Sequence, residues 1–307
     1  MIAAITGANG FIGQHLVNRF LEAGWETRPV VRRDFESGSL EHAFAYADVI
    51  VHAAGATRAP THAELLASNV GLTRRVIEAA RRAKAGRLVF ISSQAAAGPA
   101  AARETPITED HPPAPHEAYG RSKLEAERLV ETATDLDPVI VRPAAVYGPG
   151  DKDFLTMFQL ARLGIAIHPG NRDQWISIVH VDDLVRCIVA AATEAKSVGR
   201  TYFLSNDDPV QWRQLFRDAA MCARRSLAVD LELPSILVRF AAGIGDVAAR
   251  LTGTAGLVTT EKLALSEPRY WICSSERAKR EVGFAPQIDL GRGLRETYEW
   301  YRANHWL

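Results

Sequence analysis

Two kinds of side chain in the middle of the chain could carry acid–base chemistry. Tyr119 and Lys123 stand four residues apart, so a helix would place them on one face. A free tyrosine titrates at about pH 10, and a neighbouring ammonium favours its phenolate, which predicts a phenol able to exchange a proton near neutrality. Ser92 and Ser93 end an apolar run upstream, where a hydroxyl could bind a substrate carbonyl. Chance Tyr-x-x-x-Lys pairs and turn-capping serines are common, so these residues gain meaning from the elements around them.

A glycine-rich turn near the start of the chain could hold a dinucleotide. Thr6–Gly13 reads T-G-A-N-G-F-I-G. Gly7 and Gly10 permit a tight turn and close approach of a pyrophosphate, and Gly13 lets the following helix pack on the sheet. The N-terminus of that helix offers unpaired N–H groups to the anion. The turn therefore predicts a nucleotide cofactor.

The end of the second predicted strand indicates which cofactor. An acid at this place would bind the ribose hydroxyls of NAD, whereas this chain has Arg32 followed by Arg33. A guanidinium pairs well with the 2′-phosphate of NADP. The alternative is an ordinary surface arginine, and Asp34 stands close by. We expect NADP(H) to be preferred, with NAD(H) as the second choice.

The elements that must position these groups alternate between short apolar runs and amphipathic segments, which is typical of a parallel sheet flanked by helices. The predicted strands are Ile2–Thr6, Thr27–Val31, Asp48–His52, Arg87–Ser92 and Val139–Arg142. The predicted helices between them are Phe11–Ala23, Leu65–Ala83 and Ala118–Thr134. The ligand then lies where the carboxyl ends of the strands meet.

Beyond Gly148 the pattern loosens, and we expect a smaller lobe on that edge of the sheet. The predicted elements after Gly148 are a helix at Phe154–Leu163, a strand at Ile176–Val179, a helix at Asp183–Glu194 and a strand at Thr201–Leu204. From Asn206 onward mostly helices and loops are expected. The predicted fold class is α/β, a Rossmann-type doubly wound parallel sheet with a smaller, mostly helical C-terminal substrate lobe. The dinucleotide-binding domain is assigned residues 1–150 plus about 176–205, and the substrate lobe residues 151–175 plus 206–307.

Together these motifs resemble the extended short-chain dehydrogenases/reductases, which include NDP-sugar epimerases and dehydratases, dihydroflavonol reductases and 3β-hydroxysteroid dehydrogenases. The resemblance covers nearly the whole chain. Besides the motifs above it includes Asp48–Gly55, Asn69-Val70, Arg142–Gly150 and His180–Leu184.

The resemblance implies a role for each matching residue. Ser93 would be the catalytic serine, Tyr119 the acid/base, and Lys123 would also hold the nicotinamide ribose. Asn69 would support the site, Asp182 would cap a helix and His180 would be architectural. The remaining implied cofactor contacts are Gly7, Gly10, Phe11, Ile12, Gly13, Arg32, Arg33, Ala53, Ala54, Gly55, Pro143 and Val146.

Two departures from the family pattern concern the ends of the ligand site. The interval Asp34–Ala47 lacks the Gly-Asp-x-x-Asp element whose acid reaches the adenine. Ahead of His180 the chain has Gln174-Trp175-Ile176-Ser177, with only Arg172 upstream, where sugar-nucleotide enzymes often place an arginine for the diphosphate. Such an aromatic and aliphatic lining favours a small or apolar substrate.

The leading hypothesis is therefore an NAD(P)-dependent oxidoreductase that transfers hydride to or from a carbonyl or alcohol. The first alternative is an NDP-sugar epimerase or dehydratase, which recycles its cofactor. The second alternative is a protein that senses NADP(H) without catalysis. Such proteins tend to lack the tyrosine–lysine pair, whereas this chain has it as Tyr119 and Lys123.

Composition limits the other possibilities. Lys plus Arg and Asp plus Glu number 36 each, so no basic field favours nucleic acid. The three cysteines lack metal-site or disulfide spacing, which predicts no metal and a cytoplasmic location. No signal peptide is expected, and Ile236–Leu251 is too short and charged to span a membrane, so it is predicted to be an amphipathic helix over the pocket or on the core. By analogy with the family, a homodimer would use Leu65–Ala83 and Ala118–Thr134.

Overall fold

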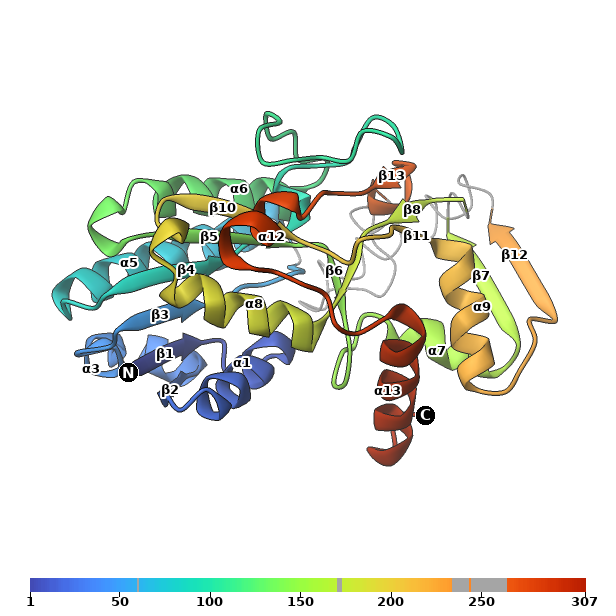
Figure 1. Ribbon diagram of the computed structural model, residues 1–307, viewed down its shortest axis with the longest axis horizontal. Helices are drawn as coiled ribbons and strands as arrows, with labels where there is room; N and C mark the ends of the chain where they lie inside the picture. The colour runs from blue at the N-terminus through green and yellow to red at the C-terminus, as the bar shows by residue number, and fades with distance from the viewer. Residues whose placement is uncertain (60, 170–172, 234–242, 244–263) are drawn as a thin grey trace.

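A parallel sheet of six strands forms the centre of the larger part of the molecule (Figure 1). The computed structural model describes residues 1–59, 61–169, 173–233, 243 and 264–307. The strands lie in the order β10 (Arg200–Leu204), β5 (Val139–Pro143), β4 (Arg87–Ile91), β3 (Val49–His52), β1 (Ile2–Thr6) and β2 (Glu26–Val30). All five pairings are parallel, which confirms the predicted Rossmann-type sheet.

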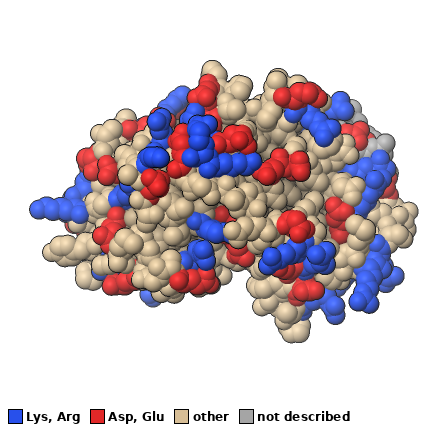
Figure 2. All heavy atoms as spheres, viewed as in Figure 1, with Lys and Arg blue, Asp and Glu red and all other residues tan. Residues whose placement is uncertain are grey.

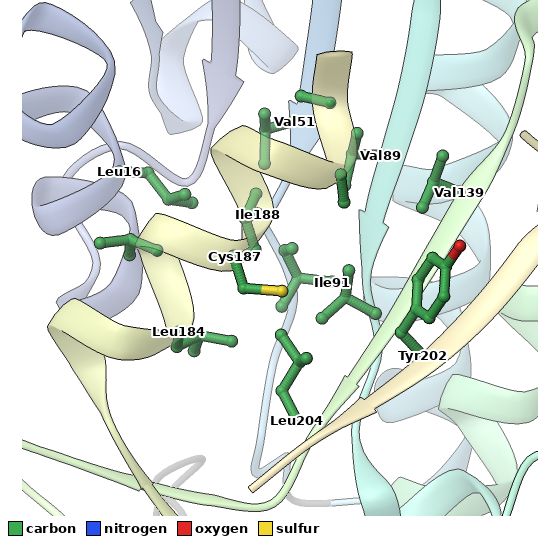
Figure 3. Packing of buried hydrophobic residues seen from close by; sticks show 14 of the residues in the cluster. Leu16, Val51, Val89, Ile91, Val139, Leu184, Cys187, Ile188, Tyr202 and Leu204 are labelled. Atoms are coloured by element: carbon green, nitrogen blue, oxygen red, sulfur yellow. The ribbon is translucent and has the colours of Figure 1, made fainter. Parts of the chain in front are cut away.

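Helices cover both faces of this sheet, as the nearly continuous apolar strands require. One face packs against α1 (Phe11–Glu22), α8 (Val181–Thr193) and α12 (Glu276–Val282). In Figure 3 Ile188 of α8 lies beside the strand residues Val51 and Val89, and Leu16 of α1 and Leu184 of α8 belong to the same cluster. The opposite face packs against α3 (Leu40–Phe44), α5 (Leu72–Arg82) and α6 (Ala118–Glu131).

A smaller lobe lies beyond the carboxyl ends of the strands (Figure 1). It contains α7 (Leu155–Arg162), β7 (Ile165–Pro169), α9 (Trp212–Cys222), β12 (Val229–Leu233) and α13 (Leu290–Ala303). Its core is aromatic, with Phe158, Phe216 and Tyr301 buried together. β7 and β12 form a two-stranded parallel sheet, so the C-terminal part of the chain contains more strand than predicted.

Short strands connect the two parts. β6 (Ala145–Tyr147) pairs with β9 (Ile178–His180), while β8 (Trp175–Ile176) lies between β11 (Val210–Gln211) and β13 (Tyr270–Trp271). The single strand predicted at Ile176–Val179 is therefore wrong. The chain changes partners at Ser177, whose backbone and side chain bond to Trp271 and Cys273 of the C-terminal segment.

The helix predicted at Leu65–Ala83 is longer and irregular. It starts as α4 (His62–Leu66), widens into a single π-helical turn, η1 (Ala67–Gly71), and continues as α5. Such turns insert one residue into a helix and are frequent at functional sites. The remaining short turns are η2 (Gln94–Ala96), η3 (Thr134–Leu136) and η4 (Ala195–Ser197).

The interval that lacks the adenine-binding motif also lacks a strand. Residues 31–48, all of them described, form α2 (Arg32–Glu36), α3 and connecting turns. β2 is consequently the edge strand of the sheet. The additional strand that would carry the Gly-Asp-x-x-Asp element beside β2 is not formed by residues 31–48.

Three expectations concern absences or undescribed residues. Apart from Gly243, the segment Ile236–Leu251 lies outside the described residues. Across the part of the chain that is described, no helix has the length and apolarity to cross a bilayer. The same described residues hold no group of three or more His, Cys, Asp or Glu side chains suited to a metal ion.

Candidate functional site

Two backbone segments form a cradle at the carboxyl ends of β1 and β3. Gly7 has a positive φ of 70°, and a Cβ placed on it would lie 2.8 Å from the Ala54 nitrogen. A Cβ on Gly13 would lie 2.0 Å from the Gly7 oxygen, so the first turn of α1 is pressed against the glycine turn. No side chain caps α1 at Gly10, which leaves its N–H groups available to an anion. The cradle fits a dinucleotide pyrophosphate because the glycines let β1, β3 and α1 meet closely, with the free N–H groups of α1 at the turn.

Four of the other residues implied for the cofactor, Phe11, Ile12, Ala53 and Val146, pack against the same face of the sheet. Phe11 and Ile12 begin α1 and pack against the core on that face of the sheet. Gly55 brings the cradle to Lys123, because a Cβ on Gly55 would lie 3.9 Å from the Lys123 Nζ. Pro143 ends β5 and Val146 lies in β6, which follows it directly.

Arg32 and Arg33 start α2 immediately after β2, and both are exposed. Arg33 approaches Asp34, with 3.9 Å between Nε and Oδ1. Within the described residues no carboxylate pairs with Arg32. Asp34 itself accepts a hydrogen bond from the Val31 nitrogen at 2.7 Å and so caps α2. The acid close to the arginines is therefore engaged by the backbone.

Tyr119 lies in the first turn of α6, opposite Ser93. Glu117 fixes this turn because its side chain accepts a hydrogen bond from the Gly120 nitrogen at 2.7 Å. Ser93 caps η2 by accepting from the Ala95 nitrogen at 3.1 Å, and its hydroxyl is also hydrogen-bonded to the Tyr119 hydroxyl. The phenol and the serine hydroxyl therefore lie side by side, where both could reach one substrate oxygen.

The predicted fall in the pKa of Tyr119 is wrong for the protein alone. Burial raises the pKa of Tyr119 to about 12, and the hydrogen bond from Ser93 offsets only part of that effect. Lys123 is itself buried, and its Nζ donates to the Ile91 carbonyl at 2.6 Å and lies 4.4 Å from the centroid of the Phe90 ring. Burial lowers the pKa of Lys123 to about 8, although the charge of Glu127 opposes the shift. The ammonium is thus held by a backbone carbonyl.

Asn69 links the cradle to the helix that carries the tyrosine. Its Nδ2 donates to the Ala56 oxygen at 3.0 Å and to the Ser122 Oγ at 2.8 Å, while its Oδ1 accepts from the Ala56 nitrogen at 2.9 Å. Ser122 in turn donates to the Tyr119 carbonyl at 2.7 Å. The π-helical turn at Ala67–Gly71 contains Asn69, so the inserted residue and this connection occur together. Ser122, between the two residues of the motif, was not foreseen.

A buried ion pair holds the other serine. Glu127 accepts hydrogen bonds from Arg142 at 2.9 Å from Nε and 2.7 Å from Nη2, and it also accepts one from the Ser92 hydroxyl. Ser92 is therefore tied into the core, which leaves Ser93 to face Tyr119. Sequence reasoning missed Glu127, although it stands four residues after Lys123 and eight after Tyr119 on the same helix.

The helix-capping role at the start of α8 belongs to a different residue than predicted. His180 caps the helix, its Nδ1 accepting from the Asp182 nitrogen at 3.3 Å, so the prediction of Asp182 as the cap is wrong. Asp182 instead lies 3.1 Å from the Nδ1 of His15 on α1. Asp183 accepts from the Gln287 and Ile288 nitrogens at 3.0 Å each and so fixes the C-terminal segment.

The segment predicted to give an apolar lining also carries a cation. The Arg103 guanidinium lies 3.7 Å from the centroid of the Trp175 ring. Gln174 is buried and donates to the Leu265 and Pro268 carbonyls at 2.8 Å each. Arg172 lies outside the described residues. The surroundings of Trp175 are therefore mixed, since Arg103 comes from a distant loop that sequence spacing does not reveal.

Comparisons with known proteins identify the family and the fold. Residues 3–204 match the family described as NAD dependent epimerase/dehydratase. The chain is similar to the ceramide reductase of Caulobacter vibrioides, at 30% identity over 100% of this chain and 96% of that protein. It is also similar to the UDP-glucose 4-epimerase of Vibrio cholerae, at 28% identity over 95% of this chain and 93% of that protein. The structure of MoeE5 in complex with UDP-glucuronic acid and NAD has the same fold, with a TM-score of 0.80 and 24% identity over 99% of this chain and 100% of that chain.

Proposed function

Because the chain belongs to the NAD dependent epimerase/dehydratase family, and so is an NAD(P)-dependent enzyme, we propose that it interconverts a carbonyl and an alcohol on a small or apolar substrate with NADP(H). The observation that carries the proposal is the hydrogen bond between Tyr119 and Ser93, with the buried Lys123 one turn further along the same helix. A proton donor, a second hydroxyl and a cation at one place are what carbonyl reduction requires.

The cofactor would be held by the cradle residues Gly7, Gly10, Phe11, Ile12, Gly13, Ala53, Ala54 and Gly55 and by Lys123, Pro143 and Val146. When bound, it would supply the hydride that is added to the substrate carbon in reduction, or accept the hydride that is removed in oxidation. Arg32, exposed and without an acidic partner among the described residues, would pair with the 2′-phosphate of NADP(H), and Arg33 would stand beside it.

The chain's own residues would manage the proton. Ser93 donates a hydrogen bond to the carbonyl oxygen, and Tyr119 delivers its proton to the same oxygen as the alcohol forms. With a pKa raised to about 12, Tyr119 is a protonated phenol at neutral pH, which suits a general acid in the direction of reduction. The Lys123 ammonium stabilises the phenolate that remains.

The similarity to a ceramide reductase supports an apolar substrate with a ketone or hydroxyl near a polar group. A second candidate, NDP-sugar epimerisation, is favoured by Arg103, which lies over Trp175 and has no carboxylate partner within the described part of the chain. Such a cation could meet a diphosphate. Oxidation of NADPH by the enzyme in the presence of long-chain ketones would support the first candidate. Conversion of UDP-glucose with no net change in NADPH would support the second.

Tyr119→Phe tests the proposal. We expect the loss of NADPH-dependent ketone reduction with little change in the NADPH dissociation constant, because the phenol hydroxyl acts on the substrate. Tyr46→Phe is the matched control, since Tyr46 is 86% exposed on the surface. Near-normal turnover by Tyr119→Phe would remove the catalytic assignment.

A further inference from the structure

The end of the smaller lobe carries exposed aliphatic side chains and exposed arginines. Of the nine large apolar side chains exposed in the described part of the chain, four lie there: Leu163, Met221, Val229 and Leu231, with 65%, 63%, 46% and 49% exposed. They come from the residue after α7, from the end of α9 and from β12, and an apolar surface of this kind on one lobe points to a contact surface.

The parallel pairing of β7 and β12 explains why this surface is apolar. Val229 pairs with Ile165 and Leu231 with Ile167, so their side chains share one face of the two-stranded sheet. The opposite face packs on α9, where His168 meets the Phe216 ring and Asp230 binds His168 and Arg213 at 3.0 and 2.8 Å. His168 and Asp230 thus point toward α9, whereas Val229 and Leu231 lie on the other face and Glu232 is exposed at the far end of β12.

Basic residues surround the end of this face. Arg162 and Leu163 precede the turn at Gly164, whose carbonyl accepts from the Ala228 and Val229 nitrogens at 2.8 and 3.1 Å. Arg224 and Arg225 precede that second segment, and all three arginines are exposed. Within the described residues none of the three pairs with a carboxylate. Figure 2 shows Lys and Arg side chains along the outer edge of the lobe that holds α9 and β12 in Figure 1, with Asp and Glu side chains among them.

We propose that this surface, the apolar–basic tip formed by Leu163, Met221, Val229 and Leu231 with Arg162, Arg224 and Arg225, docks on an anionic lipid bilayer. Arginines flanking exposed aliphatic side chains match a surface of acidic headgroups over acyl chains. The charge decides the occupant, since an apolar partner protein would leave three arginines without acids. Docking would be peripheral and does not depend on the proposed catalytic residues.

Vesicle flotation tests the proposal with the full chain. We expect binding to vesicles of phosphatidylcholine and phosphatidylglycerol, weak binding to phosphatidylcholine alone, and release at high salt because the attraction is screened. Each arginine near an anionic surface contributes about fivefold to binding, so Arg224→Glu with Arg225→Glu should weaken it about 25-fold or more. The matched control is Arg74→Glu with Lys196→Glu, which changes the net charge equally on exposed residues of α5 and η4.

Other occupants would give distinct results. Leu163→Ser with Leu231→Ser should abolish vesicle binding while leaving the thermal unfolding temperature unchanged. A large fall in that temperature would mean that the chain itself covers the face, and a dimer that these substitutions dissociate would mean that a second copy does. Either result, or equal vesicle binding by the arginine variant and its control, overturns the proposal.

Discussion

The cofactor preference can be tested at one side chain. Arg32 begins α2 directly beyond the end of β2, is exposed and has no acidic partner within the described residues. A hydrogen bond to a charged group contributes about 1.5–3 kcal/mol, and an exposed contact falls at the lower end of that range because water screens it. Since 1.4 kcal/mol is a factor of ten, Arg32→Asp should raise the dissociation constant for NADPH about tenfold.

Calorimetric titration of NADPH and NADH with the parent protein and the variants measures this effect. NADH lacks the 2′-phosphate, so its dissociation constant should change much less in Arg32→Asp. Arg33→Asp should have a smaller effect on NADPH, because the Arg33 side chain is 87% exposed and already approaches Asp34. Equal losses for the two cofactors would refute the reasoning, and a larger loss in Arg33→Asp would move the phosphate contact to that residue.

Three further predictions follow from the site. Gly13→Ala should sharply weaken NADPH binding, because the new Cβ would meet the Gly7 oxygen at 2.0 Å, whereas Gly71→Ala enters open space and should leave binding unchanged; equal affinities would contradict the cradle. Glu127→Ala should lower the free energy of unfolding by about 3–5 kcal/mol, because Arg142 stays buried without its partner. A decrease under about 1 kcal/mol, measured by chemical denaturation, would show that the pair contributes little to stability. With the pKa of Lys123 at about 8, its ammonium is present below that pH and lost above it, so kcat for reduction should fall as pH rises through 8, and a flat profile to pH 10 would exclude this role.

The sequence predicted where the candidate catalytic residues lie in the fold better than it predicted their pKa values. Strand and helix periodicity placed Thr6–Gly13, Ser93 and Tyr119 at the carboxyl edge of a parallel sheet, because each element is specified locally by its own residues. The pKa of Tyr119 was predicted in the wrong direction because burial raises it and the nearby charges of Glu117 and Asp153 act in the same direction. Neither is visible in the spacing of Tyr119 and Lys123.

Contacts between distant segments were also beyond sequence reasoning. Glu127 with Arg142, and Arg103 with Trp175, join parts of the chain that no local pattern relates. The helix cap at His180 was missed for a different reason: an aspartate is the commoner cap, but here Asp182 turns to His15 of another helix. Tertiary partners decided each of these cases.

The outer position of β2 has a consequence for how copies of this protein behave toward one another. An open strand offers unpaired backbone groups that can recruit another chain into intermolecular β-aggregates. Pro29 removes one of these donors, and the Arg28 side chain reaches across to the Ala45 carbonyl at 2.5 Å while also binding Glu26. The sheet can therefore end at β2 and dispense with an outer strand without becoming a template for self-association.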